Sequence, residues 1–275
     1  MSIGLQGLAD AIDASGLVRS GTRGVAMLSG GPDSACLAAG LVALLGPDNV
    51  DAIHINYRLR PGADADEAVC RDLCGRLRVD LRVERPTLPA GNVQAAAREA
   101  RYEAAERLRS RYGSDWIATG HSRSDLAETM LYRLAASPGR RALLGMAPRR
   151  GRLVRPLLSL GREQLRDVAV GAGLPFSDDP SNQDPRYARS RIRGEVLPVL
   201  REISPEVERN LVLTWREIAQ EADALDGQAN SVLAASVTGE PAAGAPGRGA
   251  PAAGQGNALP TAALVDLHPG VRRIV

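Results

Sequence analysis

A glycine-rich segment between two apolar runs is the feature that most constrains the fold of this chain. The first run spans Gly24 to Leu28, the segment Ser-Gly-Gly-Pro-Asp-Ser occupies Ser29 to Ser34, and an alanine- and leucine-rich run continues to about Leu45. This order predicts a strand, a phosphate-binding loop and a helix whose first amides point at the anion. Two adjacent glycines let the backbone come close to a phosphate. The alternative is a glycine turn in which Asp33 or Ser34 caps the helix.

Charge and composition narrow the class of protein. The loop lacks the lysine of a Walker A motif, and all 34 basic residues of the chain are arginine, which argues against an ordinary P-loop NTPase. The net charge is only +2, so no overall field indicates a nucleic-acid partner. Arginines nevertheless gather between Arg140 and Arg193, and a solvated surface and a phosphate-binding track explain them equally well. The cluster consists of Arg140, Arg141, Arg149, Arg150, Arg152, Arg155, Arg186, Arg189, Arg191 and Arg193.

The chain contains no apolar stretch long enough to span a bilayer and no basic-then-apolar leader after Met1. We therefore expect a cytoplasmic protein that does not associate with membranes. The three cysteines lack the spacing of metal ligands. Cys70 and Cys74, four residues apart on a predicted helix, fit small buried residues better than a redox pair.

Strand and helix patterns alternate along the first two-thirds of the chain. This alternation predicts an α/β fold with a doubly wound parallel sheet, in which ligands lie beyond the carboxyl ends of the strands. After the first strand, the apolar runs predict strands at 50–57, 79–83, 116–119 and 155–158. Helices are expected at 1–20, 65–77, 92–112 and 162–172.

Two regions are predicted, an α/β domain over residues 1–188 and a smaller helical C-terminal region over 189–275. The second region contains predicted helices at 189–200 and 206–233. An Ala/Gly/Pro-rich stretch at about 236–260 has almost no large apolar residues, so it is expected to be a flexible insert. The last residues return to apolar patterning without a stop signal, which suggests that the chain ends inside an element.

A second group of polar residues follows the predicted strand at 116–119. Asp125 and Glu128 are one helical turn apart, and His121 lies four residues before Asp125. Two carboxylates and an imidazole at the end of a strand could hold magnesium or an ammonium group and could transfer a proton. The alternative is a capping arrangement of Ser122 with Asp125, with Glu128 exposed.

Several motifs in order resemble the tRNA(Ile)-lysidine synthetases, which are PP-loop ATP pyrophosphatases. The similarity runs from about Gly24 to Leu200. It rests on Ser29 to Ser34, His54 to Arg60, Gly91 to Tyr102, His121 to Thr129, Gly145-Met146, Arg155 to Leu157 and Asp179 to Pro198. The resemblance implies an adenine nucleotide alpha hydrolase-like, Rossmann-like domain. It also implies ATP-dependent ligation of free L-lysine to C2 of the wobble cytidine in an isoleucine tRNA with a CAU anticodon. The reaction passes through an adenylated cytidine and gives lysidine, AMP and pyrophosphate.

The resemblance also implies roles for individual residues. The catalytic set is Asp33, Arg101, His121, Asp125 and Glu128. ATP would bind Ser29, Gly30, Gly31, Pro32, Asp33 and Ser34, with Mg²⁺ at Asp33. The tRNA phosphates would contact Arg140, Arg141, Arg189, Arg191 and Arg193. No stable protein partner is implied, and a homodimer is compatible with the pattern.

The sequence departs from the family pattern at six positions, which are Tyr57, Arg58, Ser122, Ser124, Leu126 and Ser190. Arg58 stands where the family usually has glycine, and Ser124 where it usually has an acid. Two rival functions remain. One is another tRNA-modifying PP-loop enzyme such as a thiolase, although this chain has no C-x-x-C pair. The other is a catalytically silent relative that binds tRNA or nucleotide.

Overall fold

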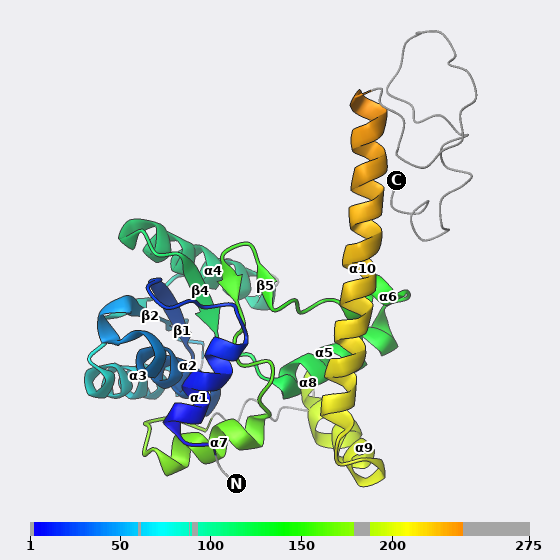
Figure 1. Ribbon diagram of the computed structural model, residues 1–275. Helices are drawn as coiled ribbons and strands as arrows, with labels where there is room; N and C mark the ends of the chain where they lie inside the picture. The colour runs from blue at the N-terminus through cyan, green and yellow to red at the C-terminus, as the bar shows by residue number, and fades with distance from the viewer. Residues whose placement is uncertain (1–2, 60–61, 88, 90–92, 179–187, 239–275) are drawn as a thin grey trace, which may run out of the picture. The chain divides into compact units, whose positions relative to one another are not determined.

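The computed structural model describes residues 3–59, 62–87, 89, 93–178 and 188–238 (Figure 1). The chain divides into two compact units, Met1–Val212 and Leu213–Val275. The whole sheet and all of the predicted site residues belong to the first unit. The predicted division at residues 188 and 189 falls within the first unit and stays a prediction.

A six-stranded sheet forms the centre of the first unit. Its strand order is β3-β2-β1-β4-β6-β5, and every neighbouring pair is parallel except β5 with β6. The strands are β1 Gly24–Leu28, β2 Val50–Ile55, β3 Leu81–Glu84, β4 Trp116–Thr119, β5 Arg149–Arg150 and β6 Leu153–Val154. Every residue of β1, β2 and β4 is buried, as expected for strands covered on both faces. The predicted α/β fold with a mostly parallel sheet is therefore confirmed.

Helices connect the strands and cover both faces of the sheet. The helices of the first unit that precede the C-terminal segment are α1 Leu5–Ala14, α2 Pro32–Leu45, α3 Ala63–Leu77, α4 Val93–Tyr112, α5 Arg123–Ala136, α6 Arg140–Leu143 and α7 Arg162–Gly171, with a short 3₁₀ turn at Pro47–Asn49. Successive side chains of β1 point to opposite faces. Ala26 and Leu28 pack in a core with residues of α1, α2, α3 and α7, whereas Val25 and Met27 pack with residues of α4.

The last strand lies earlier in the chain than the sequence pattern predicts. Residues 155–158 form no strand, and β6 ends at Val154. Pro156 cannot donate a backbone hydrogen bond, and the backbone N–H of Arg155 closes the β5–β6 hairpin on the carbonyl of Pro148 at 2.9 Å. Leu157 is fully buried, so the apolar run that suggested a strand reflects burial of these side chains and not strand formation. The hairpin itself turns at Gly151, whose φ of +59° favours glycine.

The predicted helix at 189–200 is divided into three pieces. They are α8 Ala188–Arg191, a π-helical segment Ile192–Val196, and α9 Leu197–Ile203. Pro198 has no N–H to continue an α-helical ladder, and the π segment shifts the hydrogen-bond phase just before it. The next helix, α10, spans Val207–Thr238. It therefore covers the first residues of the predicted insert, and residues 239–260 lie outside the described part of the chain.

Cys36, Cys70 and Cys74 are all buried free thiols, which for Cys70 and Cys74 agrees with their interpretation as small buried residues. Burial raises the pKa of each of these thiols to about 12. They therefore remain protonated and unreactive at neutral pH. Within the described ranges, no helix is both long and apolar enough to cross a membrane.

Gly24 offers a test of the packing between β1 and β4. A Cβ atom at this position would lie 2.1 Å from Cδ2 of the buried Trp116 ring. Gly24→Ala is expected to lower the free energy of unfolding by about 1–3 kcal/mol, because the indole cannot move without displacing the core. Gly75→Ala is the control, since no atom lies within 4 Å of its added Cβ and alanine favours the helix. Urea denaturation of both variants measures the difference, and equal stabilities would contradict the packing.

Candidate active site

The glycine-rich loop is a compact turn between β1 and α2. The hydroxyl of Ser34 accepts a hydrogen bond from the backbone N–H of Ser29 at 3.1 Å and donates one to the carbonyl of Gly31 at 2.9 Å. Gly30 has a φ of +92°, a conformation that favours glycine. Its carbonyl accepts a hydrogen bond from the N–H of Ser177 at 2.8 Å. Helix α2 begins at Pro32, so the first amides of this helix lie at the loop as predicted.

Helix α2 and the end of β4 come into backbone contact. A Cβ atom on Gly120 would lie 2.9 Å from the carbonyl oxygen of Asp33 and 3.0 Å from the amide nitrogen of Ser34. Only glycine fits this approach without displacement. The segment that follows Gly120 therefore begins beside the first turn of α2.

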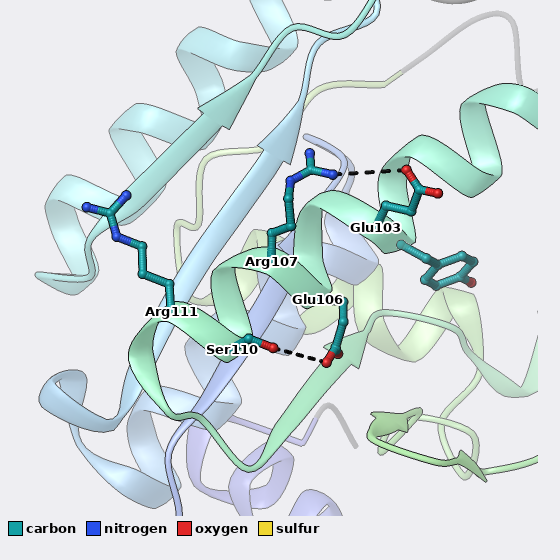
Figure 2. A pocket seen from close by; sticks show the side chains of 6 residues that line it. Glu103, Glu106, Arg107, Ser110 and Arg111 are labelled. Carbon is teal, nitrogen blue, oxygen red and sulfur yellow. Dashed lines mark hydrogen bonds and ion pairs between the residues drawn. The ribbon is translucent and has the colours of Figure 1, made fainter.

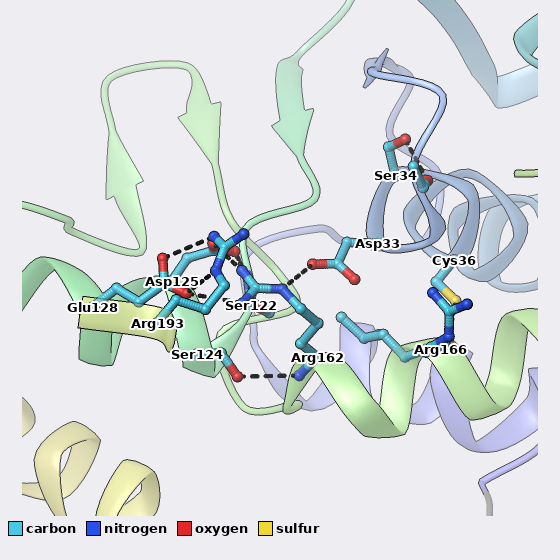
Figure 3. A network of polar contacts seen from close by, with 12 residues as sticks. Asp33, Ser34, Cys36, Ser122, Ser124, Asp125, Glu128, Arg162, Arg166 and Arg193 are labelled. Atoms are coloured by element: carbon cyan, nitrogen blue, oxygen red, sulfur yellow. Dashed lines mark hydrogen bonds and ion pairs between the residues drawn. The ribbon is translucent and has the colours of Figure 1, made fainter. Parts of the chain in front are cut away.

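Three predicted acidic residues meet around one arginine (Figure 3). Arg162, the first residue of α7, binds Asp125 Oδ1 at 2.7 Å and Glu128 Oε1 at 2.8 Å, and its Nε lies 3.9 Å from Asp33 Oδ2. The structure thus brings Asp33, Asp125 and Glu128 to one place. The sequence analysis missed Arg162. One signal was available, because a cation in the first turn of a helix opposes the helix dipole and calls for nearby carboxylates.

Glu128 is buried between two arginines. Its side chain is 1% exposed and binds Arg162 and also Arg193, whose Nε lies 2.7 Å from Oε1 and whose Nη2 lies 3.0 Å from Oε2. The alternative of an exposed Glu128 is therefore wrong. Arg193, predicted to contact tRNA, donates to this carboxylate instead of lying wholly on the surface.

Asp125 both caps α5 and joins the charged cluster. Its Oδ2 accepts hydrogen bonds from the N–H and the hydroxyl of Ser122, at 2.8 and 2.9 Å. Burial raises the pKa of Asp125, but Arg162, His121 and the two bonds from Ser122 outweigh burial and hold the pKa below its usual range. The capping interpretation and the functional interpretation of Asp125 are thus compatible.

Asp33 has the opposite electrostatic balance. Burial, followed by repulsion from Asp125, raises its pKa to about 7 although Arg162 and Arg193 oppose the shift. Its Oδ1 is buried and has no hydrogen-bond partner among the described residues. An unpartnered carboxylate oxygen beside a phosphate-binding loop fits Mg²⁺, which is usually held by one or two carboxylates together with phosphate oxygens. In the described part of the chain no group of three or more His, Cys, Asp or Glu residues could hold a metal, so phosphate oxygens would have to complete the coordination.

His121 is held by the end of β4 and is neutral at pH 7. Its Nδ1 lies 2.7 Å from the hydroxyl of Thr119. Burial lowers the pKa of His121 to about 4; Asp125 opposes this shift, and Arg155, Arg101 and Arg189 reinforce it. His121 precedes α5, which begins at Arg123, so it does not share a helical face with the two carboxylates.

Arg101 lies on α4, and its positive charge helps to lower the pKa of His121. Its guanidinium lies over the ring of Tyr102 at 5.6 Å from the ring centre. The buried Nε of Arg101 has no hydrogen-bond partner within the residues that the structure describes. Arg101 therefore keeps an unused donor near the site.

The remaining predicted tRNA-binding arginines differ in their surroundings. Arg140 and Arg141 are exposed on α6. Arg189 donates to the hydroxyl of Thr129 at 2.7 Å, and Arg191 pairs with Glu195 at 3.1 Å. Arg155 is buried, so it cannot belong to an exposed phosphate-binding track.

Three positions that depart from the family pattern have structural explanations. Arg58 has a φ of +53°, which explains why glycine is suited to that position. The hydroxyl of Ser124 accepts a hydrogen bond from the backbone N–H of Arg162 at 3.2 Å and donates to Glu208 Oε2 at 2.7 Å. Leu126 is fully buried in the core.

A separate depression of about 880 Å³ lies along α4, away from the loop (Figure 2). All of its lining residues come from that one helix, namely Tyr102, Glu103, Glu106, Arg107, Ser110 and Arg111. Two pairs of its polar groups interact, Ser110 with Glu106 at 3.3 Å and Arg107 with Glu103 at 4.0 Å. It is a furrow on one helix face and contributes nothing to the acidic cluster.

The family model of the PP-loop domain matches residues 11–200, which include the loop and the whole acidic cluster. The chain belongs to the PP-loop family. Among curated proteins, it is 40% identical over 221 residues to a tRNA(Ile)-lysidine synthase of Salinispora arenicola, covering 74% of this chain and 65% of the relative. It is 36% identical over 227 residues to a tRNA(Ile)-lysidine synthase of Pseudomonas putida, covering 81% of this chain and 51% of the relative. The chain thus spans about half to two-thirds of the length of these relatives.

Among solved structures, this PP-loop protein is similar to the U34-tRNA thiolase NcsA from Methanococcus maripaludis, a structure with a [4Fe-4S] cluster. The TM-score is 0.66, the sequence identity is 14%, and the match covers 78% of each chain. At this identity the similarity shows a shared fold.

The depressed pKa of His121 predicts a defined acid sensitivity. An imidazole whose pKa falls from 6.5 in the unfolded chain to about 4 in the folded protein is protonated first in the unfolded chain. Its contribution to stability is complete above pH 6.5 and is lost as the pH falls towards 4, by up to about 3 kcal/mol. His121→Gln should reduce this pH dependence, as measured by urea denaturation at intervals between pH 7 and pH 4. Parallel curves for the two proteins would show that His121 is not a buried neutral imidazole.

Proposed function

We propose that this protein joins free L-lysine to C2 of the wobble cytidine of an isoleucine tRNA with a CAU anticodon, at the expense of ATP. The observation that carries the proposal is the meeting of Asp33, from the phosphate-binding loop, with Asp125 and Glu128, from the motif of the lysidine synthases. The curated relatives bear that name over the same part of the chain. The products are lysidine, AMP and pyrophosphate.

The first step is attack of the cytosine C2 oxygen on the α-phosphate of ATP, which expels pyrophosphate. The backbone N–H groups at the start of α2 that follow Pro32 are proposed to stabilise the charge that accumulates on the leaving polyphosphate. Asp33 would hold Mg²⁺ through its unpartnered Oδ1. When bound, the ion neutralises charge on the phosphate oxygens.

The second step requires the neutral amine of lysine, which attacks C2 and expels AMP. Free lysine has a pKa of about 10.4, so reaching the amine form at pH 7 costs roughly 4–5 kcal/mol. Asp125 and Glu128 are proposed to provide the negative potential that holds the ammonium group. Asp125 is the better placed to touch it, because it is 17% exposed whereas Glu128 is 1% exposed and is committed to two arginines.

A neutral His121 is suited to a late proton transfer. With a pKa of about 4 it is a weak base towards free lysine ammonium, so the ammonium group first loses one proton to solvent water to form the amine. After attack on C2, the new nitrogen carries a positive charge next to an electron-poor carbon and becomes much more acidic, so His121 can accept that proton. Arg101 is proposed to bind the lysine carboxylate or a phosphate with its unused donor.

The substrates imply a cytoplasmic location, since free lysine, ATP and tRNA occur there together. The proposal needs no second protein, and a homodimer is compatible with it. The similarity to the thiolase NcsA supports the fold, while the absence of a C-x-x-C pair in the sequence argues against thiolase chemistry.

Labelled lysine provides the direct test. The protein is incubated with ATP, Mg²⁺, labelled lysine and a tRNA(Ile) transcript with a CAU anticodon, and both tRNA-bound label and pyrophosphate are measured. Asp125→Asn should abolish incorporation while leaving tRNA binding largely intact, because the negative charge that attracts the ammonium group is lost. Asp178→Asn is a matched control, since Asp178 also pairs with an arginine of α7 but is exposed, at 63%.

Full incorporation by Asp125→Asn would remove Asp125 from the site. Pyrophosphate release without incorporated lysine, in the wild-type protein, would favour another PP-loop modification. Binding of tRNA without pyrophosphate release would identify a silent relative.

Binding of tRNA should weaken steeply with salt, because arginine–phosphate contacts release counterions. Replacing both Arg140 and Arg141 with alanine is expected to reduce the slope of log K against log salt concentration by about 2. Arg82→Ala, which removes an exposed arginine paired with Glu84 on β3, should leave the slope unchanged. Filter binding at several salt concentrations measures the slopes, and equal slopes for all three proteins would place the tRNA elsewhere.

A further inference from the structure

Arg162 occupies a position that is unfavourable for a positive charge. It is the first residue of α7, where the helix dipole disfavours positive charge. Its side chain is only 29% exposed, so it also gives up much of its hydration. Three carboxylates compensate for both costs, and all three belong to the proposed active site.

The guanidinium binds two carboxylates with two different nitrogen atoms. Nη2 donates to Asp125 Oδ1 at 2.7 Å and Nη1 donates to Glu128 Oε1 at 2.8 Å. Because the guanidinium is planar and rigid, these two bonds set the distance between the carboxylates as well as their directions. Asp125 is held from its other side by Ser122, and Glu128 from its other side by Arg193. Arg162 is thus the link between two separately anchored acids.

Arg162 is itself held in place by a second set of hydrogen bonds. Its backbone N–H donates to the hydroxyl of Ser124 at 3.2 Å, and that hydroxyl donates to Glu208 Oε2 at 2.7 Å. Ser124 and Glu208 are both buried. These bonds fix the start of α7 against α5, so the backbone of Arg162, from which the guanidinium extends, has a defined position.

The charge balance explains why the link matters for a cationic substrate. When ionised, the three carboxylates carry three negative charges, and Arg162 with Arg193 supplies two positive charges. The two arginines thus balance Asp125 and Glu128, and the remaining negative charge is that of Asp33. Without Arg162 the carboxylates would repel one another, and protonation or side-chain rotation would relieve that repulsion.

We propose that Arg162 is a positioning residue for the lysine amine, holding Asp125 and Glu128 at a fixed separation and in fixed directions. The inference rests on the proposed function. The rival role is direct contact of Arg162 with the phosphates of ATP. The positioning role is favoured because both Nη atoms are already committed to carboxylates at 2.7–2.8 Å.

Steady-state kinetics of the full chain separates the two roles. Arg162→Ala should raise the KM for lysine by about 10-fold or more while changing the KM for ATP by less than about 3-fold. Arg162→Lys keeps the charge but cannot bridge both carboxylates with a rigid fork, so its KM for lysine should lie between those of Arg162→Ala and the wild type. Arg166→Ala is the matched control, one turn later on α7, where the arginine forms an exposed pair with Asp178. It should leave both KM values unchanged.

Two results would overturn the proposal. A larger rise in the KM for ATP than in the KM for lysine would assign Arg162 to the phosphates. Equal losses towards every substrate, in step with a lower melting temperature, would make it a purely structural residue.

A double-mutant cycle on the free energy of unfolding tests the positioning role of Arg162 separately from the proposed function. If Arg162 and Asp125 are coupled, Arg162→Ala combined with Asp125→Asn should destabilise the protein less than the sum of the single changes. If the wild-type protein incorporates no lysine, the proposed function fails, whereas additive effects on stability overturn the positioning role itself.

Discussion

The position of the candidate site depends on one close backbone contact at the carboxyl edge of the sheet. The end of β4 touches the first turn of α2 so closely that a Cβ atom on Gly120 would lie 2.9 Å from the carbonyl oxygen of Asp33. Parallel strands β1 and β4 are neighbours in the sheet, so their carboxyl ends open at the same edge. The loop after β1 therefore supplies the amides that we propose bind phosphate, and the segment after β4 supplies His121 and the two acids. A bulkier residue at position 120 would separate these two contributions.

Bringing acids together at this edge has an electrostatic cost that the arginines offset. A buried carboxylate without a partner is strongly unfavourable, and three of them repel one another. Glu128 avoids the cost through two guanidinium groups, and Asp125 through Arg162 and the two hydrogen bonds from Ser122. The arginines of this lysine-free chain are suited to the task, since a guanidinium can bind two carboxylates at once and stays charged when buried. The cluster is thus as much a scaffold for the site as a part of it.

The sequence predicted the parts of the fold and site that depend on local patterns. Burial on both faces produces apolar strands, and the order of strands and helices identified the sheet and its loops. Asp33 was recognised through the glycine-rich motif and Asp125 and Glu128 through their spacing after a strand, and the family resemblance implied the roles of all three. Arg162 was missed because its partners lie 34 to 129 residues away in sequence, and only the placement of α7 beside both α2 and α5 brings them together. The β5–β6 hairpin was missed for a different reason, the lack of a local sequence pattern. Its first strand is two exposed arginines, which carry no apolar alternation.

Asp125 and Asp33 have pKa values shifted in opposite directions, and this difference suggests a division of roles. Arg162 and Ser122 hold the pKa of Asp125 low, so Asp125 stays ionised and can attract a cation at any physiological pH. Burial raises the pKa of Asp33 to about 7, and its Oδ1 lacks a partner among the described residues. A carboxylate in that condition gains most from a ligand, because an arriving cation supplies the missing partner and favours the ionised form. The protein's own arginines pair with Asp125 and Glu128, whereas Asp33, in the first turn of α2, is the acid that we propose a bound cation completes.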